Sequence, residues 1–131
     1  MPAATERRPV GSTGLTVPLI GFGTATIANL YTDIPEEQAV ETIHDVLDNG
    51  IDFLDTAPFY GAGLAEKRLG IALAGIPRES SIMETEVGWL VGPDGDIIKD
   101  YSGDGIRRSL ETSLQRMNAP RCPNRPVFAA W

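Results

Sequence analysis

The stretch from Ile51 to Gly61 constrains this 131-residue chain more than any other part of its sequence. It opens with a largely apolar run, Ile51 to Leu54, which has the length and composition of a buried strand. The run ends at Asp55, and a loop that carries Tyr60 follows. In parallel α/β folds, chemistry collects at the carboxyl ends of strands and in the loops after them. Taken alone, the stretch is also typical of a polar strand end with a tyrosine packed against the next helix.

Strand and helix signals alternate along the rest of the chain. Gly50 is placed to end a helix, and Ser102 is the best candidate to cap the start of another. The predicted elements are an edge hairpin around Ser12–Gly14, strands over residues 19–24, 51–54 and 81–87, helices over 35–49, 64–74 and 104–117, and a hairpin that joins 89–91 to 97–98. This order predicts an α/β fold with parallel strands.

Several motifs, in a fixed order, make the chain resemble the aldo-keto reductases. The motif Asp55-Thr56-Ala57-Pro58-Phe59-Tyr60-Gly61 is similar to the signature of that family. The other matching pieces are Gly21-Phe22-Gly23-Thr24, Glu66 with Leu69-Gly70, Thr85-Glu86-Val87-Gly88, Asp100-Tyr101-Ser102 and Arg108-Ser109-Leu110-Glu111. The resemblance covers residues 8–117. The opening motif is similar to the branch that contains bacterial D-threo-aldose and pyridoxal 4-dehydrogenases.

The resemblance implies a particular fold for the whole chain. The family folds as a (β/α)8 barrel, also called a TIM barrel, and a complete barrel typically needs about 250 residues. We therefore expect residues 1–131 to form a truncated barrel of about three βα units with an N-terminal β-hairpin. Residues 118–131 depart from the family and are rich in proline.

The resemblance also implies a reaction and a set of site residues. The family transfers a hydride reversibly between NAD(P)H and an aldehyde, a ketone or a sugar alcohol. The resemblance assigns the role of proton donor to Tyr60 and that of a supporting carboxylate to Asp55. It also places Thr24, Asp55 and Tyr60 beside the nicotinamide. The choice between NAD and NADP stays open, and no residue is expected to bind a metal.

Glu86 occupies the position that the family gives to a lysine in the third strand. A cation there would favour the tyrosinate, whereas a carboxylate should raise the pKa of Tyr60 and repel Asp55. General acid–base help is typically worth about 10²–10⁴ in rate, so we expect most of it to be lost. Glu86 could instead be a new acid for another chemistry, or a benign replacement that points into solvent.

Three hypotheses about function follow. The first is a truncated and inactive, or severely impaired, aldo-keto reductase. The second is a non-catalytic binding or assembly module built on the partial barrel, and the third is a fragment of a longer active chain. In this chain the strands that begin near Leu19 and Ser81 are each expected to leave one sheet edge unpaired, and exposed edges favour self-association.

Composition excludes several other classes. The formal net charge of -7 argues against a nucleic-acid partner. No apolar run approaches the roughly 18 residues of a membrane span, so no membrane partner is expected. A single cysteine, Cys122, and the lack of a signal-peptide pattern at the N-terminus predict a cytoplasmic protein.

Overall fold

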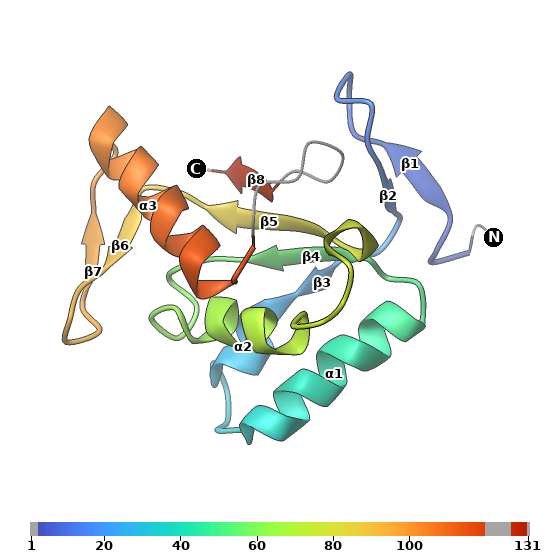
Figure 1. Ribbon diagram of the computed structural model, residues 1–131, viewed down its shortest axis with the longest axis horizontal. Helices are drawn as coiled ribbons and strands as arrows, with labels where there is room; N and C mark the ends of the chain where they lie inside the picture. The colour runs from blue at the N-terminus through green and yellow to red at the C-terminus, as the bar shows by residue number, and fades with distance from the viewer. Residues whose placement is uncertain (1–2, 120–126, 131) are drawn as a thin grey trace.

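The computed structural model describes residues 3–119 and 127–130 and has a four-stranded parallel sheet at its centre (Figure 1). The strands are β3 (Phe22–Gly23), β4 (Phe53–Thr56), β5 (Ile82–Glu86) and β8 (Val127–Ala130), in the spatial order β3-β4-β5-β8. The predicted α/β fold with parallel strands is confirmed.

The sheet has one strand more than the sequence predicts. The backbone of β8 pairs in parallel with β5, with Glu84 opposite Phe128 and Glu86 opposite Ala130. The expectation that β5 leaves its outer edge unpaired is therefore wrong. Proline removes backbone donors, which is why a Pro-rich stretch disfavours a strand. Pro120, Pro123 and Pro126 lie outside the described residues, and β8 begins directly after them.

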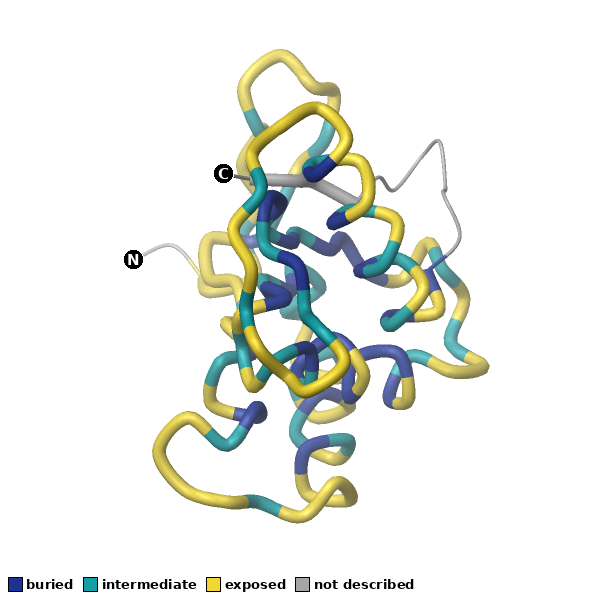
Figure 2. Tube along the Cα trace, turned by 90° about the vertical axis from the view of Figure 1, so that its left-hand side faces the viewer, coloured by how far each residue is buried: buried dark blue, intermediate teal, exposed yellow. Residues whose placement is uncertain are grey.

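Three helices cover one face of the sheet: α1 (Glu36–Asp48), α2 (Leu64–Ala72) and α3 (Gly103–Arg116). Their bounds lie within one or two residues of the predicted ones. The core joins the helices to Leu54 of β4 and Met83 of β5; its other members are Ile27, Ala39, Ile43, Leu69, Ala72, Met117 and Ala119. Figure 2 shows these buried segments surrounded by exposed loops. None of the helices in the described part of the chain is long and apolar enough to cross a membrane.

Local chemistry explains where α3 begins and which of its faces is buried. The Ser102 hydroxyl accepts a hydrogen bond from the Gly105 amide at 3.1 Å, as expected of an N-cap. The buried positions of the helix are Gly105, Ser109 and Ser113, and the line continues to Met117. Small residues face the body of the protein because α3 passes close to its neighbours: a Cβ at Gly70 of α2 would lie 2.6 Å from the Arg116 carbonyl oxygen.

Short elements complete the fold. The N-terminal hairpin pairs β1 (Arg7–Pro9) with β2 (Thr16–Pro18), and a second hairpin pairs β6 (Trp89–Val91) with β7 (Ile97–Lys99), both as predicted. Two 3-10 helices, η1 (Thr24–Ala28) and η2 (Arg78–Ser80), precede α1 and β5. The first parallel strand is shorter than the predicted 19–24, because Leu19 and Ile20 are exposed and η1 begins at Thr24.

Candidate active site

Three carboxylates lie on the face of the sheet that is turned away from the core. Side chains alternate between the two faces of a strand, so the burial of Leu54 and Met83 on the helix side places Asp55 and Glu84 on the other. The register sets Asp55 directly opposite Glu84, and Glu86 follows on the same face. All three are half-buried.

Tyr60 lies in a tight loop between β4 and α2. Its amide donates to the Ala57 carbonyl at 3.1 Å, and its carbonyl accepts from the Ala65 amide at 3.3 Å. Gly61 needs the left-handed backbone (φ +62°), and a Cβ there would lie 2.7 Å from the Ala28 carbonyl oxygen. The loop is therefore packed closely against the end of η1, and Tyr60 is half-buried.

The carboxylates and the phenol act on one another. Burial raises the pKa of Tyr60 above that of a free tyrosine, and the charges of Asp55, Glu86 and Glu84 raise the same pKa further. Burial is also the main cause of the raised pKa of Asp55. For Glu84 and Glu86, burial comes first and the Asp55 charge second, so the pKa of each is raised as well. Glu86 thus acts on Tyr60 in the direction that its charge predicts.

No cation offsets these three carboxylates within the described ranges. The ion pairs shown there are Arg7–Asp52, Arg8–Glu6, Arg107–Asp104 and Arg116–Glu66. Lys99 lies over the ring of Trp89, with its Nζ 4.5 Å from the ring centroid. Residues 3–119 and 127–130 also contain no group of His, Cys, Asp and Glu side chains placed to hold a metal ion.

The structure brings together three of the four predicted site residues. Asp55, Tyr60 and Glu86 share one electrostatic environment. Thr24 is fully buried, and its hydroxyl has no hydrogen-bond partner among the described residues. Its predicted role at the nicotinamide stays a prediction. Glu84 is a fourth member that the prediction omitted, although it lies two residues before Glu86 and alternate residues of a strand share a face.

A buried ion pair behind the sheet was also not assigned any role from the sequence. Glu66 of α2 is fully buried; one carboxylate oxygen accepts from the Thr85 hydroxyl at 2.8 Å, and the other contacts the Arg116 guanidinium at 2.5 Å. Two residues further along α2, Arg68 donates to the carbonyl oxygens of Ile27 and Ile34. In the sequence, Glu66 stands out only as part of the family motif that it forms with Leu69-Gly70.

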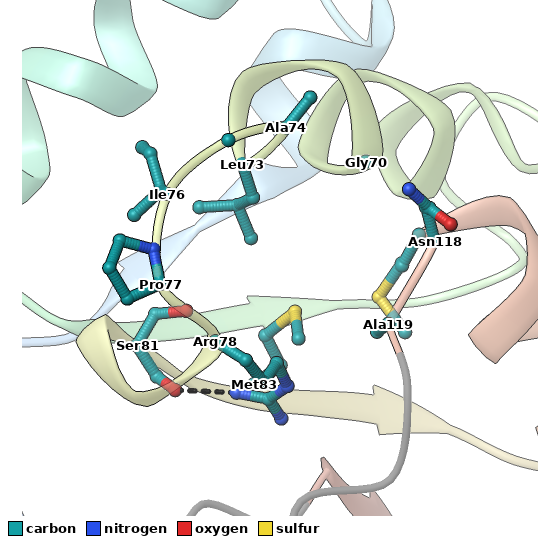
Figure 3. Close-up of a pocket in the computed structure, with 12 residues that line it drawn as sticks. Gly70, Leu73, Ala74, Ile76, Pro77, Arg78, Ser81, Met83, Asn118 and Ala119 are labelled. Atoms are coloured by element: carbon teal, nitrogen blue, oxygen red, sulfur yellow. Dashed lines mark hydrogen bonds between the residues drawn. The ribbon is translucent and has the colours of Figure 1, made fainter.

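A separate cavity of about 200 Å³ lies at the opposite end of β5 (Figure 3). It is lined by the end of α2 and the segment after it, by the residues that follow α3, by Ser81 just before β5 and by Met83 within β5. Arg78 on its wall donates to the Ser81 carbonyl at 2.8 Å. None of the predicted site residues lines this cavity.

Comparison with known proteins identifies the family. Residues 19–122 match the Aldo/keto reductase family. L-galactose dehydrogenase of Arabidopsis thaliana is 36% identical over 86% of this chain and 34% of its own length. D-threo-aldose 1-dehydrogenase of a Pseudomonas species is 32% identical (82% and 39%), and pyridoxal 4-dehydrogenase of Microbacterium luteolum is 33% identical (89% and 41%).

Solved structures agree with these sequence relatives. The holo form of an aldo-keto reductase from Bacillus halodurans superposes with a TM-score of 0.75 and 34% identity, over 88% of this chain and 37% of that one. An aldo/keto reductase from Klebsiella pneumoniae in complex with NADP and acetate gives a TM-score of 0.62 and 27% identity, over 81% and 33%. This chain spans about 34–41% of the length of the curated relatives it matches. The predicted resemblance is confirmed, and the chain belongs to the aldo/keto reductase family.

Proposed function

We propose that this chain carries the proton-transfer side of an aldo-keto reductase site, Tyr60 supported by Asp55, and that Glu86 leaves it inactive or severely impaired. The reaction class is NAD(P)-dependent hydride transfer to or from an aldehyde, a ketone or a sugar. The names of the three relatives, which act on L-galactose, D-threo-aldoses and pyridoxal, support a small carbonyl or sugar substrate. The single cysteine supports a reducing, cytoplasmic location.

The observation that carries the proposal is the electrostatics around Tyr60. A general acid works best when its pKa lies near the operating pH. The free phenol already has a pKa of about 10, and here burial and then the charges of Asp55, Glu86 and Glu84 raise the pKa of Tyr60 further. The phenol can donate a hydrogen bond to a carbonyl oxygen, but its proton is harder to release than in water. The reverse step, which needs the tyrosinate, is disfavoured by the same charges.

The described residues do not fit a whole dinucleotide. NAD(P) brings a negatively charged pyrophosphate, and the face that carries Tyr60 presents Asp55, Glu84 and Glu86. Two of the cations in the described part of the chain are already engaged, Arg116 with Glu66 and Lys99 with Trp89. Like charges disfavour binding, so we derive no hydride-transfer step from this chain alone.

A non-catalytic binding or assembly module is the second candidate. It is favoured by the half-buried state of Asp55, Glu84 and Glu86, which no ion pair of the described residues neutralises. A partner that covers this face would have to bring positive charge. This candidate needs no cofactor at all.

One experiment tests the first candidate. NADH and NADPH are titrated into the purified chain, with fluorescence of Trp89 and Trp131 as the readout, and their oxidation is followed with several aldehydes. We expect weak or absent binding and no useful turnover. Turnover that is lost in Tyr60→Phe would refute the proposed effect of Glu86. A Glu86→Lys variant that folds, binds a dinucleotide and turns over would refute the proposal that the described part of the barrel cannot hold the cofactor.

A further inference from the structure

Tyr60 is held by contacts that reach it from behind the sheet. The loop from Tyr60 to Gly63 leads directly into α2, and the Leu64 and Ala65 amides donate back to the Gly61 and Tyr60 carbonyls. Whatever fixes the first turn of α2 therefore also fixes the loop. Glu66 lies in that turn and is the one acidic residue in it.

Glu66 connects this turn to two other elements. Through the Thr85 hydroxyl it is bonded to β5, one residue from both Glu84 and Glu86. Through Arg116 it is bonded to the last residue of α3. Glu66 is fully buried, with an exposed fraction of 0%.

Arg116 also touches the loop itself. A Cβ placed on Gly63 would lie 2.9 Å from Arg116 Nε and 3.0 Å from its Cδ, so the side chain runs directly over the Gly63 backbone. Gly63 has φ +87°, a conformation that suits glycine. The same guanidinium thus covers the end of the Tyr60 loop and pairs with the carboxylate that follows it.

We propose that the buried series Arg116–Glu66–Thr85 is the positioning element for Tyr60, and that it holds the Tyr60–Gly63 loop against the carboxyl end of β5. A buried charge pair with additional hydrogen bonds favours one geometry, because the fully buried Glu66 carboxylate would lose partners that water does not reach. The series therefore fixes the separation between the phenol on the loop and the carboxylates on β5. Its catalytic meaning rests on the proposed function of Tyr60, but its structural content does not.

Thr85→Val is the test, and Thr56→Val is its matched control. Thr56 and Thr85 lie opposite each other on β4 and β5, and both are fully buried. The Thr85 hydroxyl donates to Glu66, whereas the Thr56 hydroxyl has no partner within the described part of the chain. The same isosteric change therefore breaks the series at one site and leaves it intact at the other.

The readout is the titration of the Tyr60 ring by NMR, assigned by its absence in Tyr60→Phe. In the parent chain, burial and then the charges of Asp55, Glu86 and Glu84 raise the Tyr60 pKa. If the loop loosens in Thr85→Val, the ring gains water and moves away from those carboxylates. We then expect the pKa of Tyr60 to move down toward that of free tyrosine, together with faster hydrogen exchange of the Ala65 amide. Thr85→Ser should restore both, and Thr56→Val should change neither.

A merely structural role would give a different result. Thr85→Val would then lower the free energy of unfolding while leaving the Tyr60 titration at its parent position, and this outcome would overturn the proposal. If Thr85→Val does not fold, Arg116→Lys tests the other end of the series, because it keeps the charge and loses the contact of the guanidinium with Gly63. An unchanged Tyr60 titration and Ala65 exchange rate in folded Arg116→Lys would overturn it equally. Neither readout needs turnover, so failure of this inference is distinct from failure of the proposed function.

Discussion

Replacing Arg116 with methionine should destabilise the fold severely, because it leaves the charge of Glu66 buried without its partner. The exposed fraction of the Glu66 side chain is 0%, and that of Arg116 is 15%. Removing one partner of a buried pair typically costs about 3–5 kcal/mol, against about 0–1 kcal/mol for an exposed pair. Methionine keeps most of the aliphatic stem, so lost packing contributes little. We expect the free energy of unfolding to fall by the first of these amounts, about 3–5 kcal/mol. This is a large part of the roughly 5–15 kcal/mol that stabilises a typical domain.

The two partners should not be equivalent. In Glu66→Gln, the amide oxygen can still accept from the Thr85 hydroxyl, and the partly exposed Arg116 can turn its guanidinium toward water. We expect this variant to lose about 1.5–3 kcal/mol, the cost of one hydrogen bond to a charged group. The double variant should lose less than the sum of the two single losses, because removing both charges leaves none unpaired.

Equilibrium unfolding in urea, followed by circular dichroism and tryptophan fluorescence, measures all three losses. The comparison requires that the denaturant dependence of the unfolding free energy stays the same among the variants. A loss below about 1 kcal/mol in Arg116→Met would refute the reasoning, since it is the value of a solvated surface pair. Equal losses in the two single variants would refute the argument from unequal burial.

Four further predictions concern charge, packing, activity and association. Burial raises the folded-state pKa of Asp55, Glu84 and Glu86. The contribution of these groups to stability is therefore present below their unfolded-state pKa and is lost as the pH rises through the raised values. The free energy of unfolding should increase on mild acidification, and Glu86→Gln should reduce that increase. Gly70→Ala should lower the free energy of unfolding by about 1–3 kcal/mol, because the new Cβ would meet the backbone at the end of α3. Gly103→Ala, whose Cβ would have no atom within 4 Å, should be neutral or stabilising by up to about 1 kcal/mol. Equal shifts of the melting temperature in the two variants would contradict this. Glu86→Lys alone should not produce NADH or NADPH oxidation with aldehydes above background, because it supplies no phosphate contacts. The chain should associate or bind a hydrophobic dye through its sheet edges, and a sharp monomer peak in size-exclusion chromatography with cooperative unfolding would count against this.

The sequence predicted those elements whose residues signal their own structure. The bounds of α1 and α2 follow from apolar residues at helical spacing ended by glycine, and Ser102 identifies the start of α3 through its hydroxyl. The hairpins follow from glycine and proline at the turns. These signals are local, so no knowledge of the tertiary structure was needed.

The features that were missed depend on contacts between distant segments. The apolar stripe that the spacing predicts for the third helix is Ile106, Leu110, Leu114 and Met117. Met117 is buried, but the other three are only half-buried. The fully buried line includes Ser109, whose hydroxyl donates to the Trp89 carbonyl at 2.8 Å, a contact that no spacing rule predicts. The burial of Glu66 is equally invisible, because carboxylates are almost never fully buried unless they are paired, and its partners lie 19 and 50 residues away.

The candidate site was easier to predict than its support because strand β5 separates the two. Its alternating side chains place Glu84 and Glu86 on the open face and Thr85 on the core face, where Thr85 bonds to Glu66. A substitution at position 86 therefore changes the charge beside Tyr60 without touching the buried contacts that hold the Tyr60 loop. This separation lets the charge at position 86 vary while the fold and the packing of the Tyr60 loop are kept, which is what the proposed function requires. In the proposed function, Glu86 therefore acts through the open face of β5 alone, and the buried contacts on its core face stay as they are.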